Sequence, residues 1–92
     1  MRREVEIVNE LGLHARPAAE FVRRVQSFKC EVFICKGDAR FSAASILEVL
    51  SANLDCGTRI ILEATGPDEQ QALDRLAELL QEFRRQEERG EM

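Results

Sequence analysis

The chain has 92 residues, of which 45% are apolar and 33% are charged. This is the length of one small domain, and the composition is that of a folded rather than a disordered protein. The 13 basic and 17 acidic residues give a net charge of −4, which argues against the basic footprint of a nucleic-acid-binding protein. No apolar run approaches the roughly 20 residues that span a bilayer, and Met1 to Glu4 lead into no secretion signal. We therefore expect one cytoplasmic domain that binds no nucleic acid and inserts into no membrane.

The three cysteines, Cys30, Cys35 and Cys56, have no CxxC spacing. Together with the single histidine they are numerous enough for a zinc site, but Cys30 and Cys35 point to opposite faces of one predicted strand. We interpret all three as reduced, mostly buried apolar residues of a cytosolic protein, and we predict neither a metal nor a cofactor.

The hydrophobic period of the first half of the chain changes twice, from strand to helix and back to strand. Residues 4–8 alternate polar and apolar side chains, which predicts a strand with Val5 and Ile7 on one face. Residues 30–36 and 39–42 then predict a hairpin of two strands around a glycine turn. Between them, from residue 15, the period is that of an amphipathic helix with a buried stripe of Ala18, Phe21, Val22, Val25 and Phe28.

The second half of the chain again alternates between helix and strand patterns. Residues 45–51 predict a short helix, because Ser45 and Glu48 have the spacing of a capping box, in which each side chain satisfies a backbone donor. Residues 58–64 predict a strand with one apolar face, formed by Ile60, Leu62 and Ala64. The last predicted helix has Pro67 at its first position. Its buried stripe is Ala72, Leu73, Leu76, Leu80 and Phe83.

The predicted order is β-α-β-β-α-β-α. Each helix has one apolar stripe and each strand one apolar face, so the economical packing places the helices on one side of an antiparallel sheet. We assign residues 1–84 to this domain. Residues 85–92 are almost all charged or polar, and we predict that they form a fraying tail.

His14 stands where the predicted loop ends and the first helix begins. Helix starts prefer Ser, Thr, Asp, Asn or Gly, so a histidine there gives up the usual capping interaction. Pro17 lies in the first turn, where its missing N–H removes a donor that has no partner within the helix. The remaining amides and the helix dipole make this helix end suitable for an anion.

The residues around His14 favour phosphoryl chemistry. Histidine forms covalent intermediates, and the Arg16 guanidinium fits phosphate oxygens. Arg16 and the backbone amides of Ala15 and Arg16 are placed to stabilise transferring oxygens, as phosphoryl transfer requires. Leu11 and Leu13 flank the loop and offer an apolar rim to a partner. The alternative is that His14 is an ordinary surface residue of a loop.

The segment Gly12-Leu13-His14-Ala15-Arg16-Pro17-Ala18-Ala19 closely resembles the active-site motif of HPr, the histidine-containing phosphocarrier family of the bacterial phosphoenolpyruvate:sugar phosphotransferase system. Ser45-Ile46-Leu47, Gly57-Thr58 and Gly66-x-Asp68-Glu69 resemble further family regions in the same order. The resemblance covers about residues 4–83. It implies an α+β fold, an open-faced β-sandwich with a four-stranded antiparallel sheet and three helices packed on one face.

The resemblance also implies a function. Nδ1 of His14 is expected to accept a phosphoryl group from phosphorylated Enzyme I, ultimately from phosphoenolpyruvate, and to pass it to the EIIA domain of a sugar permease. Arg16 is expected to support the phosphate. Such a protein is a stoichiometric carrier with a covalent phosphohistidine rather than a turnover enzyme, and we expect a monomer.

Ser45 matches the serine that HPr kinase/phosphorylase modifies in many bacteria, although a capping role accounts for it equally well. Ile46, Leu47 and Leu50, with Leu13, are candidates for an apolar partner surface, and the competing interpretation is that some of them face the core. Two other functions stay open. One is a regulatory phosphotransfer adaptor, of the nitrogen type or acting through Ser45, without a sugar permease. The other is an interaction domain without chemistry, against which His14 and Arg16 argue.

Overall fold

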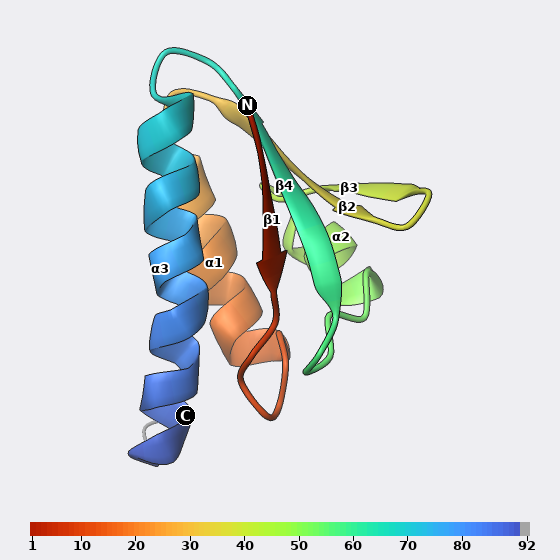
Figure 1. The fold of residues 1–92 in the computed structure, drawn as a ribbon, viewed down its shortest axis with the longest axis vertical. Helices are drawn as coiled ribbons and strands as arrows, with labels where there is room; N and C mark the ends of the chain where they lie inside the picture. The colour runs from red at the N-terminus through yellow and green to blue at the C-terminus, as the bar shows by residue number, and fades with distance from the viewer. Residues whose placement is uncertain (91–92) are drawn as a thin grey trace.

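A computed structural model describes residues 1–90. Its elements are β1 (Arg2–Glu6), α1 (Ala15–Gln26), β2 (Glu31–Lys36), β3 (Ala39–Ser42), α2 (Ile46–Ser51), β4 (Arg59–Thr65) and α3 (Glu69–Glu88). The predicted order of strands and helices is therefore confirmed, as is the predicted fold class (Figure 1).

The sheet has four antiparallel strands in the order β1-β4-β2-β3. The last strand of the chain, β4, thus lies between β1 and β2 and pairs Ile60 with Val5 and Leu62 with Ile34. Because β1 and β4 are antiparallel, the end of β1 lies beside the start of β4, with Glu6 opposite Arg59. Ile7 donates its N–H to the Thr58 carbonyl there, at 2.9 Å.

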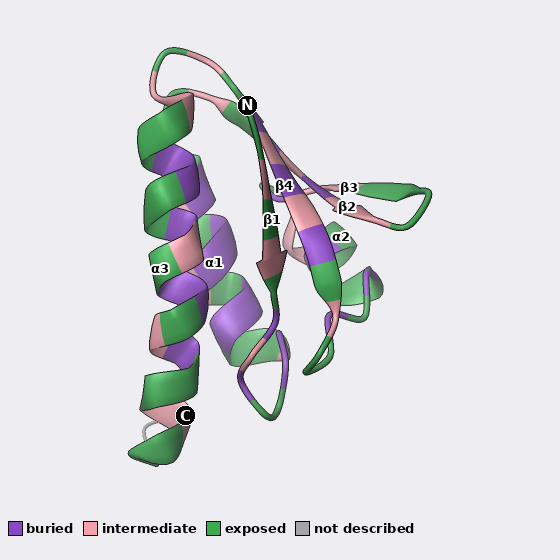
Figure 2. Cartoon of the chain, in the orientation of Figure 1, coloured by how far each residue is buried: buried purple, intermediate pink, exposed green. Residues whose placement is uncertain are grey.

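The three helices cover one face of the sheet, and the core lies between the two layers (Figure 2). Along β4 the buried residues are Ile60, Leu62 and Ala64, as the alternation predicts. The opposite sheet face combines ion pairs with half-buried apolar side chains. Glu63 lies there 3.4 Å from Arg2 and 3.2 Å from Arg40, and the Arg40 guanidinium stacks 3.8 Å from the centre of the Phe33 ring. The predicted stripes of α1 and α3 are buried, except that Phe28 is only partly buried beyond the end of α1.

The bounds of α3 differ from the prediction at both ends. Pro67 precedes the helix, and Asp68 is the N-cap residue; its carboxylate accepts a hydrogen bond from the Lys29 N–H at 2.8 Å. At the other end the helix continues to Glu88 and so includes residues 85–88 of the predicted tail. Ion pairs along the helix, such as Arg84 to Glu88 at 3.2 Å, support this last turn. Residues 91–92 of the predicted tail lie outside the described residues.

The cysteines are not buried as predicted. Cys30 and Cys35 are half-buried, and Cys56 is exposed in the turn before β4. Partial burial, with a hydrogen bond to Asp68, raises the pKa of the Cys30 thiol to about 11, so this thiol stays protonated at neutral pH. Within residues 1–90, no cluster of three or more His, Cys, Asp or Glu side chains is arranged to hold a metal ion, and no helix is long and apolar enough to cross a bilayer.

Candidate functional site

His14 is the N-cap residue of α1, the position that the sequence predicts. Its backbone is extended, with φ −76° and ψ −173°, and its carbonyl accepts the first helical hydrogen bond from the Ala18 N–H at 2.9 Å. Its side chain makes no capping hydrogen bond. The imidazole is therefore not used to close the helix, which leaves it available for chemistry.

The two ring nitrogens of His14 lie in different surroundings. Within residues 1–90, Nε2 is buried and has no hydrogen-bond partner, which is not the case for Nδ1. The residue as a whole is half-buried. Burial shields Nε2 from a reagent in solution, which makes Nδ1 the candidate nucleophile of the ring.

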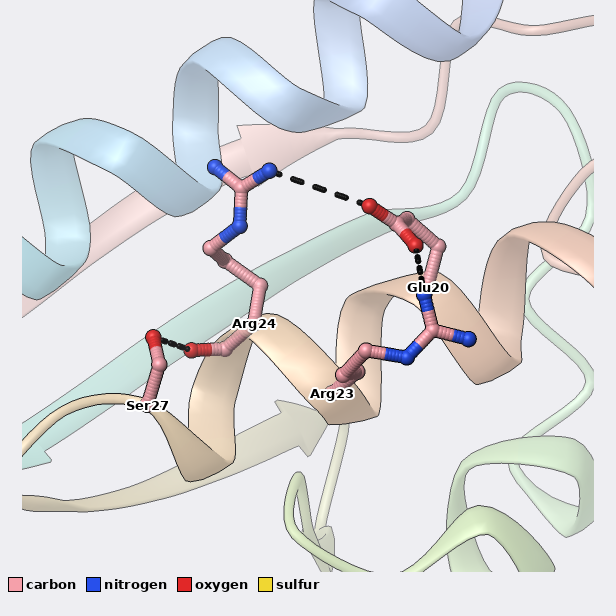
Figure 3. A network of polar contacts seen from close by, with 4 residues as sticks. All are labelled: Glu20, Arg23, Arg24 and Ser27. Carbon is pink, nitrogen blue, oxygen red and sulfur yellow. Dashed lines mark hydrogen bonds and ion pairs between the residues drawn. The ribbon is translucent and has the colours of Figure 1, made fainter.

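The start of α1 has the features of an anion site. Ala15 and Arg16 are exposed in the first turn, where backbone amides point out of the helix end. The first turn contains no acidic residue. Glu20, one turn further on, lies 2.6 Å from Arg23 and 3.7 Å from Arg24, so its carboxylate is engaged towards the C-terminal half of α1 (Figure 3). The dipole of α1 thus favours negative charge beside His14.

A close backbone contact fixes the loop before α1. Gly12 has φ +67°, and a Cβ atom at this position would lie 2.5 Å from the Leu54 carbonyl oxygen. The same carbonyl accepts a hydrogen bond from the Leu13 N–H at 2.8 Å. The loop is therefore docked on the segment that follows α2, and only glycine fits at position 12.

Leu13 is buried, with 5% of its surface exposed, so its predicted place in a partner surface is wrong. The hydrogen bond to Leu54 turns its side chain into the core cluster instead. Its neighbour Leu11 is 62% exposed and forms the apolar rim of the loop.

Asn9 and Glu87 hold the same loop from the other side. Asn9 is fully buried, and its Nδ2 donates to the Gly12 carbonyl at 2.7 Å and to the Glu87 carboxylate at 3.0 Å. Glu87 also accepts the backbone N–H groups of Glu10, at 2.6 Å, and Leu11, at 2.9 Å. The last turn of α3 is thereby tied to the loop that carries His14.

The pKa of Glu87 is lowered from its ordinary value. Burial acts in the opposite direction, but the hydrogen bonds from Leu11, Asn9 and Glu10 and the nearby positive charge of a protonated His14 outweigh it. The carboxylate is therefore ionised at neutral pH. This places a fixed negative charge close to the imidazole.

Ser45 and the predicted apolar residues lie on α2. Ser45 is the N-cap residue, and its Oγ accepts from the Glu48 N–H at 3.4 Å. The Glu48 carboxylate accepts from the Ser42 N–H at 2.9 Å, so only one half of the predicted capping box forms. Leu47 is 77% exposed and Leu50 is 37% exposed, whereas Ile46 is half-buried and packs against the core.

Sequence reasoning missed Asn9 and Glu87. Asn9 belongs to a loop without periodicity, and Glu87 lies in a run of charged residues that carries no local signal. Their contact joins positions 78 residues apart. The sequence offered a hint only in Gly12, which begins the motif around His14.

The fold and this site together define a class of protein: a small open-faced sandwich whose single histidine stands at the start of its first helix. A family model described as "PTS HPr component phosphorylation site" matches residues 1–82. The chain therefore belongs to the HPr family of the phosphotransferase system, as its motif predicts.

The relatives include both HPr and HPr-like proteins. HPr-like protein Crh of Bacillus subtilis (strain 168) is 40% identical over 82 residues, which cover 89% of this chain and 96% of that protein. Phosphocarrier protein HPr of Haemophilus influenzae is 38% identical over 78 residues, covering 85% and 92% respectively.

Solved structures agree with this assignment. HPr of Thermoanaerobacter tengcongensis superimposes with a TM-score of 0.87 at 33% identity, covering 91% of this chain and 94% of that one. A crystal structure of Bacillus subtilis Crh, described as a dimer with a swapped domain, gives a TM-score of 0.72 at 41% identity, covering 88% and 93%.

Proposed function

We propose that this protein is a cytoplasmic phosphocarrier that accepts a phosphoryl group on Nδ1 of His14 from phosphorylated Enzyme I and passes it to an EIIA domain for sugar uptake. The observation that carries the proposal is the different environment of the two ring nitrogens at the start of α1. Nε2 is buried, and Nδ1 is the nitrogen left to meet a donor. Membership of the HPr family supports the same chemistry.

The transfer forms a nitrogen–phosphorus bond on His14 while the donor's bond to phosphorus breaks. The lone pair of Nδ1 attacks the phosphorus atom, and the departing donor atom keeps the electron pair of the broken bond. Charge on the three phosphoryl oxygens is met by the amides of Ala15 and Arg16 and by the Arg16 guanidinium. Because the first turn of α1 holds no acid, no carboxylate of that turn opposes the incoming group.

The test is phosphorylation with purified Enzyme I, phosphoenolpyruvate and magnesium, followed by mass spectrometry. We expect one phosphoryl group that is labile in acid, and its absence in His14→Ala. Since the chain has one histidine, any phosphohistidine is His14. An adduct that persists in His14→Ala would overturn the proposal, and so would the absence of any adduct on the unmodified protein.

Arg16 is the proposed phosphate-stabilising residue. Arg16→Ala removes the guanidinium but leaves the helix start intact, so we expect slower transfer and an unchanged circular dichroism spectrum. Arg16→Lys keeps the positive charge but lacks the planar guanidinium, so its transfer rate should lie between those of Arg16→Ala and the unmodified protein. A transfer rate in Arg16→Ala equal to that of the unmodified protein would contradict this role.

We propose that Leu47 and Leu50, with the partly buried Ile46, form the apolar surface that Enzyme I and EIIA contact. The loop before α1 is bound to the segment after α2 by the Leu13–Leu54 hydrogen bond, which keeps this surface in a fixed relation to His14. We expect the carrier to act as a monomer. Leu47→Asp should weaken binding of Enzyme I and leave chemical phosphorylation of His14 unchanged.

A second candidate is a regulatory protein that acts through phosphorylation of Ser45 by HPr kinase/phosphorylase, without a sugar permease. The similarity to Crh, described as the catabolite repression HPr of Bacillus subtilis, favours it. Ser45 is only half-buried at the start of α2, where the helix dipole favours a phosphate. The test is an acid-stable adduct formed with ATP and the kinase that disappears in Ser45→Ala. Transfer from His14 to an EIIA domain distinguishes the carrier from the regulator.

A further inference from the structure

Among residues 1–90, the hydrogen bonds that the Glu87 carboxylate accepts all come from one loop. Oε1 accepts from the Glu10 N–H at 2.6 Å, and Oε2 accepts from the Leu11 N–H at 2.9 Å and from Asn9 Nδ2 at 3.0 Å. Hydrogen bonds to an ionised acceptor are shorter and stronger than those between neutral groups. The last turn of α3 is thus fastened to a segment 76–78 residues away in sequence.

The hydrogen bonds of Glu87 continue through Asn9 to the residues just before His14. Asn9 uses the same Nδ2 group to donate to the Gly12 carbonyl at 2.7 Å, which makes a bridge from Glu87 to the residue two places before His14. On the opposite side, the Leu13 N–H donates to the Leu54 carbonyl. The loop is consequently held from both sides, and its geometry sets how His14 enters α1.

The charged side chains near Glu87 do not replace the loop N–H groups as partners of its carboxylate. Glu10, Arg84 and Glu88 line the same surface pocket as Glu87, but Arg84 is paired with Glu88 at 3.2 Å. Burial opposes ionisation of Glu87, whereas the three loop hydrogen bonds and a protonated His14 lower its pKa. The loop therefore supplies most of the groups that keep the carboxylate charged, and removing the carboxylate leaves those donors without their acceptor.

We propose that Glu87 is a positioning residue for phosphoryl transfer, which holds residues 9–12 in the conformation that buries Nε2 of His14 and leaves Nδ1 accessible. This inference rests on the proposed function, because it assigns Glu87 a role in the reaction of His14. Glu87 lies beyond residues 1–82, the part of the chain that the family model matches. The C-terminal turn of α3 thus becomes part of the active site without contacting the phosphoryl group.

The first test is independent of phosphorylation. Amide hydrogen exchange should show protected N–H groups at Glu10 and Leu11, and both should exchange at least about tenfold faster in Glu87→Ala, a change that corresponds to the loss of one net hydrogen bond or more. Glu87→Gln keeps one acceptor oxygen and should be intermediate. Glu88→Gln removes the same charge one residue later and should leave both amides protected.

The second test measures transfer. We expect the maximal rate of phosphorylation by Enzyme I to fall about tenfold in Glu87→Ala and less in Glu87→Gln, with Glu88→Gln unchanged. The Enzyme I concentration at half-maximal rate should stay constant, because the contact surface is intact. Phosphoramidate, a small chemical phosphoryl donor, should show the same order of rates without Enzyme I. Circular dichroism and urea unfolding establish that the variants are folded.

The outcomes separate the two proposals. If the unmodified protein is phosphorylated by neither donor, the proposed function fails, whatever the exchange data show. If it is phosphorylated but Glu87→Gln and Glu87→Ala match it in rate, the positioning role of Glu87 is wrong. Unchanged amide exchange at Glu10 and Leu11 in folded Glu87→Ala would also overturn it. If Glu88→Gln slows phosphorylation as much as Glu87→Gln does, the change in net charge accounts for the effect, and the positioning role of Glu87 is wrong.

Discussion

Replacement of Gly12 by alanine tests whether close backbone packing presents His14. Gly12 has φ +67°, and an added Cβ would lie 2.5 Å from the Leu54 carbonyl oxygen and 2.9 Å from the Asp55 Cα. Gly37 is the matched control, because it has φ +59° and no heavy atom within 4 Å of the same Cβ position. The two substitutions share the conformational penalty and differ in the space available.

The magnitudes follow from these two terms. A residue with a Cβ in the left-handed region costs about 1–2 kcal/mol, which is the whole expected loss for Gly37→Ala. At Gly12 the backbone at residues 54–55 must also move, which strains the 2.8 Å hydrogen bond from Leu13 to Leu54. Leaving that buried donor unsatisfied adds about 1–3 kcal/mol. We therefore expect Gly12→Ala to lose about 2–5 kcal/mol in total.

The measurement is urea unfolding of the three proteins, with thermal unfolding as a second probe. For a domain of this size, each kcal/mol lowers the midpoint temperature by about 4–8 °C. Gly12→Ala should therefore melt clearly below Gly37→Ala. Equal losses of stability in the two variants would refute the argument, because they would mean that the contact with residues 54–55 contributes nothing.

Three further predictions concern the core, the surface and pH. Leu62→Ala removes a fully buried side chain from β4 and should lose about 2–5 kcal/mol in urea unfolding; a loss below about 1 kcal/mol would contradict its place in the core. Glu20→Gln breaks the exposed pairs with Arg23 and Arg24 and should change thermal stability by less than about 1 kcal/mol; a larger loss would mean that this network is structural. Because the pKa of Glu87 is lower in the folded state, its ionisation stabilises the fold above the unfolded value of about 4.3, and this contribution is lost as the pH falls through the folded pKa. The protein should thus be more stable than Glu87→Gln at neutral pH, and the stability difference should shrink under acid; a difference independent of pH would show that the charge is not responsible.

Local pattern was sufficient to predict the helices and strands and to single out His14 as the proposed phosphoacceptor. Alternation identified β1 and β4, a glycine turn identified the hairpin of β2 and β3, and helical spacing identified the stripes of α1 and α3. All of these signals depend only on residues close together in sequence. His14 was found for the same reason: the residues that make it unusual, Arg16 and Pro17, are adjacent in sequence. Pattern was weaker at element ends, where α3 begins after Asp68 rather than at Pro67.

The surroundings of His14 were decided by tertiary structure. The position of Leu13 in a loop predicted a surface residue. Its N–H instead donates to the Leu54 carbonyl, and its side chain is buried in the core. The charged residues after Phe83 looked like a tail, yet α3 carries Glu87 to the loop at Asn9. The half-buried Glu87 carboxylate is met by hydrogen-bond donors that lie more than seventy residues away in sequence. No local period encodes such a pairing. The sequence was therefore sufficient to single out His14 as the proposed phosphoacceptor, whereas only the folded chain brings Glu87 to the loop before it.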